Sequence, residues 1–219
     1  MRASIIVTSH NYGEFIERCL RSCLSQSLSP SEYEVILVDD ASNDQTLEIV
    51  ETFKSFANFR VIANKENVGV AESANIGIRA ALGQYVVRVD ADDFVNAHFL
   101  LFLSTYLAEN HDAFGVACDY VMADESGEKQ ERRHAEEHPI SCGILYRKDL
   151  LTKAGLYDAR FRHLEEEELR KRLGESYRIH YLRIPLYRYR MHATNKTKRL
   201  AEMAPFREEL ARREAGRKA

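Results

Sequence analysis

The sequence predicts an α/β protein with a mostly parallel central sheet and helices on both of its faces. Strand-like apolar runs at residues 4–8, 34–38 and 60–63 are each followed by a predicted helix, and in the first of these helices the apolar residues recur at helical spacing. A fourth run, residues 85–89, is rich in valine. Strands that alternate with helices in this way pair in parallel, because each helix crosses one face of the sheet between consecutive strands.

The first predicted helix begins near Glu14 and ends at Ser29-Pro30. Cys19 and Cys23 lie on its apolar face, four residues apart. Core packing is the favoured interpretation of these thiols, since none of the four cysteines has the spacing of a metal site or a disulfide framework. A reducing, cytoplasmic location fits this cysteine usage.

Two further helices complete the first half of the chain. Ser42 and Gln45 form a Ser-x-x-Gln capping box, which predicts a helix that begins there and continues to about Phe56. Residues 70–82 form the third helix, and Gly83 is placed to end it.

The second half departs from this regularity, and we expect a smaller region of sheet and helix there. We treat residues 1–199 as one domain and residues 200–219 as a basic C-terminal helix. The elements predicted beyond the fourth strand are a helix at 96–110, a strand at 115–122, an exposed ribbon or loop at 128–138, a strand at 143–147, a short helix ending at 154–155, a helix opening at 165, strands at 177–183 and 187–190 broken by Pro185, and an amphipathic helix at 200–217 interrupted by Pro205.

Composition indicates a soluble globular protein, with 45% hydrophobic and 30% charged residues. No apolar run reaches the roughly 18–20 residues that span a bilayer, and residues 1–7 enter a strand without the layout of a signal peptide.

The net charge of −3 is unevenly spread, because residues 183–219 hold eleven Lys or Arg and four Asp or Glu. That excess predicts a polyanionic partner, such as nucleotide phosphates or anionic lipid, although a plain solvated helix is an alternative. No nucleic-acid-binding module is visible.

Carboxylates follow two of the predicted strands. Asp90, Asp92 and Asp93 come directly after the fourth strand, and Asp39 and Asp40 come after the second. Because the carboxyl ends of parallel strands meet at one edge of the sheet, we expect these side chains to converge. Such carboxylates repel one another unless a cation lies between them, and Mg²⁺ or Mn²⁺ shared with substrate phosphates meets that need. The alternative is that they only cap the following loops and helices.

Short motifs in a fixed order extend the hypothesis of a nucleotide site. In chain order they are Ser4-Ile5-Ile6-Val7-Thr8 with Asn11-Tyr12, Val38-Asp39-Asp40, Asn67-Val68-Gly69 with Asn75, Asp90-Ala91-Asp92-Asp93, Gly143-Ile144-Leu145-Tyr146-Arg147, Gly155-Leu156-Tyr157-Asp158 and Tyr189-Arg190-Met191-His192. Their joint order and spacing resemble the family 2 glycosyltransferases of the GT-A fold, which are inverting enzymes that use nucleotide-diphosphate sugars. The resemblance extends from residue 4 to about residue 197.

The resemblance implies that residues 1–95 bind the nucleotide sugar and that residues 96–199 bind the acceptor and carry the catalytic group. A Mn²⁺ or Mg²⁺ ion would be held by Asp92, Asp93 and His192. Two alternatives are open, Asp93 as the N-cap of the helix predicted near residue 96, and His192 as an ordinary surface histidine. The nucleotide-sugar contacts implied by the resemblance are Thr8, His10, Asn11, Tyr12, Asp39, Asp40, Asn67, Gly69, Asp90 and Ala91.

The resemblance implies a general base at Glu165-Glu166. The family usually has Glu-Asp here, and its Asp deprotonates the acceptor hydroxyl. Glu166 takes that place, and its extra methylene can move the carboxylate by about 1 Å, which matters where positioning limits the rate. The alternative is that the four acids at 165–168 complement a helix dipole. A second departure is Ala74, where many relatives have Arg.

These residues together imply a metal-dependent inverting glycosyltransferase of polysaccharide, lipopolysaccharide or other glycoconjugate assembly. The expected donor is a UDP-sugar and the expected acceptor a glycan or a lipid-linked glycan. A peripheral contact with the cytoplasmic face of an anionic membrane and a homo-oligomer are both left open. One alternative is a non-catalytic scaffold that binds nucleotide sugars. A sugar nucleotidyltransferase would be expected to have a glycine-rich loop after the first strand, whereas residues 9–13 contain one glycine.

Overall fold

The computed structural model describes residues 1–193, 195 and 200–218. Within these residues nine strands form one sheet, in the spatial order β3-β2-β1-β4-β8-β6-β9-β5, with β7 paired to β6. This arrangement confirms the α/β class predicted from the sequence. The strands are β1 (Ala3–Ser9), β2 (Tyr33–Asp39), β3 (Phe59–Ala63), β4 (Tyr85–Asp90), β5 (Phe94–Val95), β6 (Gly115–Ala123), β7 (Lys129–Arg133), β8 (Ile144–Arg147) and β9 (Ile179–Arg190).

The strands of the first half pair in parallel. β1 lies between β2 and β4, and β2 continues the parallel sheet to β3. The strands of the second half extend the same sheet, with β8 antiparallel to β4 and β6, and β6 parallel to β9. The register places Thr8 opposite Asp90, and Ser9 opposite Asp39. The polar residues that follow β1, β2 and β4 therefore meet at one edge, as predicted.

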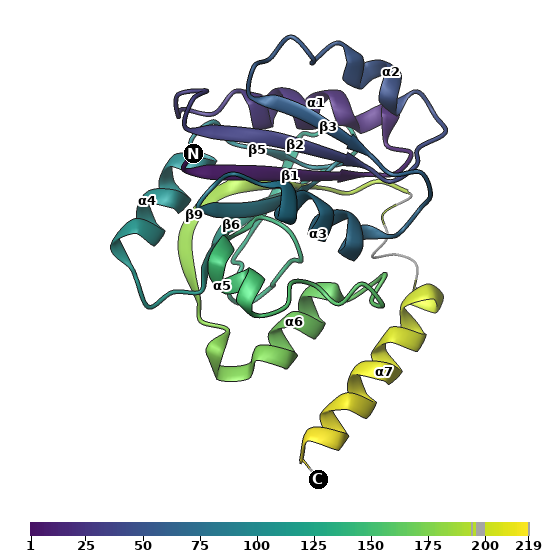
Figure 1. Ribbon diagram of the computed structural model, residues 1–219, viewed down its shortest axis with the longest axis vertical. Helices are drawn as coiled ribbons and strands as arrows, with labels where there is room; N and C mark the ends of the chain where they lie inside the picture. The colour runs from purple at the N-terminus through teal and green to yellow at the C-terminus, as the bar shows by residue number, and fades with distance from the viewer. Residues whose placement is uncertain (194, 196–199, 219) are drawn as a thin grey trace.

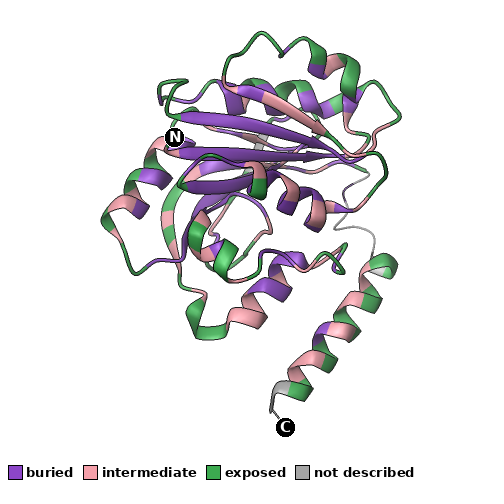
Figure 2. Cartoon of the chain, viewed as in Figure 1, coloured by how far each residue is buried: buried purple, intermediate pink, exposed green. Residues whose placement is uncertain are grey.

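Helices cover both faces of this sheet (Figure 1). Ile5 and Val7 pack with the helices of one face, whereas Ile6 between them packs with those of the other. The central strands are buried along their length (Figure 2), which explains their continuous apolar runs. One face carries α1 (Gly13–Leu24), α2 (Thr46–Glu51) and α4 (Phe99–Glu109), and the other carries α3 (Val70–Ala80), α5 (Lys148–Lys153) and α6 (Glu165–Leu173).

The four cysteines are free and buried. Cys19 and Cys23 both belong to the core between α1 and the sheet, which confirms the packing role predicted for them. Burial raises the pKa of Cys118 to about 12, so at neutral pH this thiol is protonated and behaves as a small apolar side chain.

The start of α2 differs from the prediction. The helix begins at Thr46, and no side-chain hydrogen bond of the expected capping box caps it. Instead, Oδ1 of Asp44 accepts a hydrogen bond of 3.0 Å from the Thr46 backbone N–H. Aspartate commonly makes this local turn, which offers the backbone an alternative to an earlier helix start. Ser42 contacts the loop after β1 instead, where its Oγ accepts a hydrogen bond from the Asn11 N–H.

The expected role of Gly83 as a helix cap is also wrong. α3 ends at Ala80, and Ala81 is already extended. Gly83 is required for close packing, since a Cβ atom there would lie 2.5 Å from the carbonyl carbon of Ala3. Its N–H donates to Oγ of Ser4 at 2.9 Å.

The two expected closing strands form the single strand β9, with Pro185 inside it. The register with β6 shifts beside Cys118 and Asp119, where Pro185 pairs. A proline has no N–H to donate to a ladder, so an irregularity of the pairing accommodates it. The predicted break is therefore a change of register and not an end of the strand.

The terminal helix α7 (Leu200–Lys218) contains Pro205, which does not interrupt it as expected. Its inward side packs on the protein, with Leu210 buried and the Phe206 ring 6.0 Å from that of Phe161. The predicted domain boundary after residue 199 lies outside the described residues. Among the residues that the structure describes, no helix combines the length and hydropathy needed to cross a bilayer.

Candidate active site

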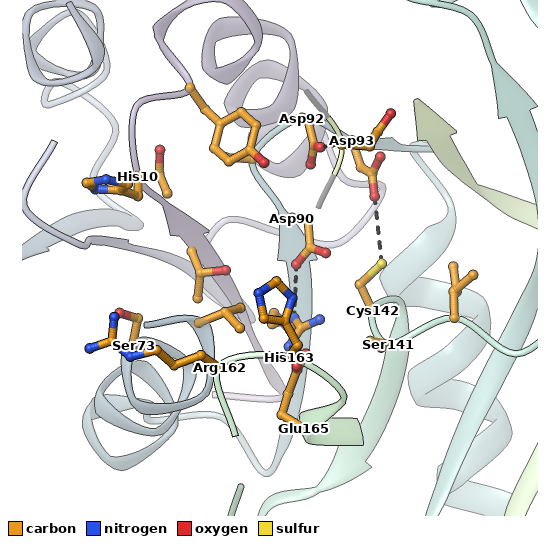
Figure 3. A pocket seen from close by; sticks show the side chains of 18 of the residues that line it. His10, Ser73, Asp90, Asp92, Asp93, Ser141, Cys142, Arg162, His163 and Glu165 are labelled. Carbon is orange, nitrogen blue, oxygen red and sulfur yellow. Dashed lines mark hydrogen bonds and ion pairs between the residues drawn. The ribbon is translucent and has the colours of Figure 1, made fainter. Parts of the chain in front are cut away.

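A pocket of about 250 Å³ opens where β1 and β4 end (Figure 3). Its walls come from the loop after β1, the acidic end of β4, the loop before β8 and the turn into α6, and Met203 of α7 adds to them. The structure thus brings together residues that are far apart in the sequence. The predicted site residues that line it are Thr8, His10, Tyr12, Asp40, Asp90, Ala91, Asp92, Asp93 and Glu165.

The other predicted residues lie outside this lining. They are Asn11, Asp39, Asn67, Gly69, Glu166 and His192. Each of them contacts a residue of the lining or lies in a segment that adjoins the pocket.

Asp40 fixes the end of the pocket formed by β2 and the turn before α3. Its Oδ1 accepts hydrogen bonds of 2.9 Å from Asn64 Nδ2 and from the Val68 N–H, and its Oδ2 accepts one of 2.8 Å from the Gly69 N–H. Burial opposes ionisation of the carboxyl, but these bonds outweigh it and lower the pKa of Asp40 below its usual range. His10 Nδ1 donates to the Asp40 carbonyl at 2.7 Å. The 67–69 turn is thereby held against the first two strand ends.

Asn11 and Asp39 hold the loop that follows β1. The Asn43 N–H donates to Asn11 Oδ1 at 2.8 Å, and the Ser42 N–H donates to Asp39 Oδ2 at 3.1 Å. Asp39 is buried, and its Oδ1 has no hydrogen-bond partner among the described residues.

Backbone strain gathers around the same pocket. Among the described residues four non-glycine residues have positive φ, namely Asn11 (58°), Ala41 (59°), Leu156 (61°) and Leu164 (62°). Three of these lie in loops that bound the pocket, and Leu164 lines it directly. Each left-handed residue costs roughly 1 kcal/mol or more, so the surrounding contacts must hold these loops.

Arg88 links the acidic strand end to α6. Its Nη1 donates to Glu165 Oε1 at 2.6 Å, and its Nε lies 2.9 Å from Asp90 Oδ1 at an angle unsuited to a hydrogen bond. Burial alone would lower the pKa of Arg88, but the charges of Asp90 and Glu165 raise it well above its ordinary value. Arg88 is therefore a fixed positive charge in the pocket lining.

The acids after β4 point in different directions. Asp92 Oδ2 lies 2.8 Å from His192 Nε2. This histidine is buried, so it is not an ordinary surface residue.

Asp93 accepts hydrogen bonds from the Tyr187 hydroxyl at 2.7 Å and from the Arg190 N–H at 2.8 Å. It does not cap α4, whose N-cap is His98. Burial, together with the charges of Asp92 and Asp90, raises the pKa of Asp93 well above its usual value.

The carboxylates at the pocket wall fit a hard divalent cation. The side chains of Asp90 and Asp92 line the pocket and are 31% and 11% exposed, and carboxylate oxygens are the ligands that Mg²⁺ or Mn²⁺ takes. Asp93 is turned inward. Among the described residues, potential ligand atoms of Asp90, Asp93 and Cys142 lie within 4.8 Å of one another. Burial first, then Asp90 and Asp93, raise the pKa of Cys142 well above its usual value, so this thiol does not suit such a cation.

The first turn of α6 carries four acids, and each has a specific partner. Glu165 pairs with Arg88, Glu167 with Lys171 at 3.0 Å, and Glu168 with Arg172 at 3.0 Å. These acids therefore make specific ion pairs in addition to any interaction with the helix dipole.

Glu166 lies behind the pocket wall among tyrosines. Its Oε1 accepts hydrogen bonds from the hydroxyls of Tyr146 (2.7 Å) and Tyr177, and its Oε2 is buried without a partner among the described residues. Burial raises the pKa of Glu166, although the two phenol hydrogen bonds act in the opposite direction. A carboxylate with a raised pKa is a better proton acceptor than an exposed one.

Several lining residues were not predicted from the sequence. A single arginine within the valine run of β4 was the available signal for Arg88, because a buried charge needs a partner. Arg162, His163 and Met203 carried no comparable signal. Residues 139–142, which also line the pocket, come from a segment in which no motif was found.

A curved α/β sheet with acidic strand ends around one pocket defines the GT-A type of nucleotide-diphospho-sugar transferase fold. The profile of the Glycosyl transferase family 2 matches residues 4–164, well over half of the chain. The protein belongs to this family, as its motifs indicated.

Individual relatives agree with this assignment. Poly(ribitol-phosphate) beta-N-acetylglucosaminyltransferase TarS of Staphylococcus aureus is 35% identical over 112 residues, which cover 51% of this chain and 20% of TarS. The uncharacterized glycosyltransferase EpsJ of Bacillus subtilis is 31% identical over 89% of this chain and 62% of its own length. The crystal structure of S. aureus TarS 1–349 in complex with UDP matches with a TM-score of 0.75 at 25% identity, covering 87% of this chain and 61% of that one. The chain thus spans between 20% and 62% of these relatives' lengths.

Proposed function

We propose that the protein transfers a sugar from a nucleotide-diphosphate sugar to an acceptor hydroxyl, with inversion at the anomeric carbon. The observation that carries this proposal is that Asp40, Asp90, Asp92 and Glu165, which come from three separate segments, line one and the same pocket. Membership of the glycosyl transferase family supports it, as does the named activity of TarS. Residues 1–95 would hold the donor, and residues 96–199 would hold the acceptor and supply the base.

The chemistry is a single displacement. A carboxylate of α6 accepts the proton of the acceptor hydroxyl while its oxygen forms a bond to the anomeric carbon. The bond between that carbon and the diphosphate oxygen breaks on the opposite face, so the configuration inverts and the nucleoside diphosphate leaves.

Asp90 and Asp92 would hold a Mn²⁺ or Mg²⁺ ion, and His192 would orient Asp92 through the contact at 2.8 Å. When bound, such an ion stabilises the negative charge that develops on the leaving diphosphate. Asp93 supports the strand end from behind, through Tyr187 and the Arg190 N–H.

Two neighbouring carboxylates are candidates for the base. Glu166 is our assignment, on the family resemblance and on its raised pKa. Glu165 is the competitor, because its side chain lines the pocket, although one of its carboxylate oxygens is already engaged by Arg88 at 2.6 Å. Mutation of each residue separates the two.

A UDP-sugar is the proposed donor, since the TarS structure contains UDP. The proposed acceptor is a glycan or a lipid-linked glycan of glycoconjugate assembly. α7 turns Phe206 and Leu210 toward the protein, so a contact with an anionic membrane would use exposed arginines such as Arg207 and Arg212.

A second candidate is a scaffold that binds the donor without transfer. The burial of Glu166 among tyrosines, outside the pocket lining, favours it. Slow hydrolysis of UDP-N-acetylglucosamine by the purified protein, lost in Glu166→Gln, would support the enzyme. Donor binding without any hydrolysis or transfer would support the scaffold.

A thermal-shift panel of UDP, GDP, CDP and dTDP, each with and without Mn²⁺, tests the donor site first. A ligand that binds only the folded state raises the melting temperature by mass action. We expect UDP to stabilise the wild type in a Mn²⁺-dependent way and to lose that dependence in Asp92→Asn. Asp149→Asn, an exposed carboxylate far from the pocket lining, is the matched control. Absence of any nucleotide effect would overturn the proposal.

A further inference from the structure

Arg162 is a pocket-lining cation that the proposed chemistry does not use. It lies in the loop that precedes α6, and it is exposed. In Figure 3 its side chain lies beside Ser73, across the pocket from Asp92 and Asp93. Its position therefore differs from that of the acidic strand end.

The contacts of Arg162 connect it to the turn that Asp40 holds. Its Nη1 lies 3.4 Å from Asn67 Oδ1, and its Nη2 lies 3.3 Å from the Asn67 carbonyl oxygen. Its Cγ would be 3.1 Å from a Cβ atom on Gly69, which has a φ of 90°. The aliphatic part of the arginine thus packs over a glycine, and with the described residues the guanidinium makes only these long hydrogen bonds.

The charge of Arg162 has no counterion in the described part of the chain. Arg88, the other arginine of the lining, is neutralised by Asp90 and Glu165. Among the described residues no carboxylate lies within 4 Å of the Arg162 guanidinium, as an ion pair would require. The guanidinium is therefore available to a ligand in the pocket.

Geometry indicates which part of a ligand would meet it. The pocket extends from Asp90 and Asp92 to Asp40, which holds the 67–69 turn that Arg162 contacts. A donor whose diphosphate lay at Asp90 and Asp92 would place its nucleoside in this remaining part of the pocket. The planar guanidinium can stack on an aromatic ring and donate to carbonyl oxygens in its plane.

We infer that Arg162 is a donor-recognition residue that contacts the nucleobase of the donor. This inference rests on the proposed function. The loop that carries Arg162 is fixed on either side, since Phe161 before it is buried and Glu165 after it pairs with Arg88 at 2.6 Å. Arg162 is thus held over the turn before the ligand arrives, which reduces the entropy lost on binding.

Isothermal titration of UDP and UMP, in the presence of Mn²⁺, into the wild type and three variants tests the inference. We expect Arg162→Ala to weaken UDP and UMP by the same factor, about tenfold, which corresponds to about 1.4 kcal/mol. Arg162→Lys should weaken the binding of both nucleotides nearly as much, because lysine keeps the charge but has no planar group. Arg160→Ala, in the same loop but with its guanidinium on Asp158 and 76% exposed, should bind within twofold of the wild type.

The outcomes separate this inference from the proposed function. No binding of UDP to the wild type would overturn both. Equal binding of UDP by the wild type and Arg162→Ala would overturn only the role of Arg162. The nucleobase assignment would be refuted if Arg162→Lys bound UDP as tightly as the wild type and Arg162→Ala lost more affinity for UDP than for UMP. That result would show that Arg162 contacts a phosphate.

Discussion

Arg88 Nη1 donates a hydrogen bond of 2.6 Å to Oε1 of Glu165, which joins β4 to the first residue of α6. Both side chains are buried, with 4% and 6% exposed. The Nε of the same guanidinium lies 2.9 Å from Asp90 Oδ1. One side chain therefore fixes the acidic strand end relative to the helix that carries the proposed base.

We predict that Arg88→Met destabilises the protein by about 3–5 kcal/mol, because Glu165 would be left as an unpaired buried charge. Urea unfolding followed by circular dichroism measures the loss. Glu165→Gln should cost less, since its amide oxygen can still accept from Arg88. A loss below about 1 kcal/mol in Arg88→Met would contradict the structural role of this pair.

Asp40→Asn should destabilise the 67–69 turn by about 1–3 kcal/mol, because one buried acceptor oxygen becomes a donor that faces an N–H group. The folded-state pKa of Asp40 lies below the unfolded value of about 3.9, so its contribution is present above that pH and is lost as the pH falls through the folded-state pKa. Urea unfolding between pH 7 and pH 3 should show this acid-sensitive component in the wild type. The same slope in the variant would assign it to another group.

Much of the fold and part of the candidate site were predictable because they depend on local pattern. The buried runs of β1, β2 and β4 fix which residues are strand and where each strand ends. Parallel pairing then requires that Asp40, Asp90 and Asp92 share one edge of the sheet, and all three line the pocket. This part of the site needed no knowledge of side-chain packing.

The rest of the site depends on the directions in which its side chains point, and a sequence pattern does not specify these directions. Consecutive residues of a helix differ in direction by about 100°, so a run of four acids leaves open which carboxylate faces the pocket. Glu165 lines it, and Glu166 turns to Tyr146 and Tyr177. Arg162 reaches its position through a loop, and loops have no periodicity from which a direction could be derived.

Glu166→Gln should reduce kcat by a hundredfold or more while the affinity for UDP stays unchanged, since general-base catalysis typically contributes about 10²–10⁴ in rate. Initial rates of transfer or of donor hydrolysis, measured with UDP titrations, provide the comparison. If Glu165→Gln shows this pattern and Glu166→Gln does not, Glu165 is the base.

The same substitution at Glu166 should stabilise the protein at neutral pH. Burial raises its folded-state pKa above the unfolded value of about 4.3, so its contribution to stability is complete below that pH and is lost as the pH rises through the folded-state pKa. Glu166→Gln removes the buried charge but keeps an oxygen for the tyrosine hydroxyls. The melting temperatures of variant and wild type should be similar near pH 4 and diverge by pH 7, with the variant higher. A variant that melts lower at pH 7 would indicate that the carboxylate is stabilised by contacts beyond these two phenols.

α7 should stabilise the segment that leads into α6 through Arg213. Its Nη1 lies 3.0 Å from Asp158 Oδ2 and 3.5 Å from Glu168 Oε1, and its guanidinium carbon lies 4.7 Å from the centre of the Phe161 ring. Arg160 and Arg172 remain as partners of the two acids, so we expect Arg213→Ala to lower the stability by only about 1–2 kcal/mol, from the lost packing and cation–π contact. Arg207→Ala, on the exposed side of the same helix, should change it by less than about 0.5 kcal/mol. Equal melting temperatures for the two variants would mean that α7 does not support this segment.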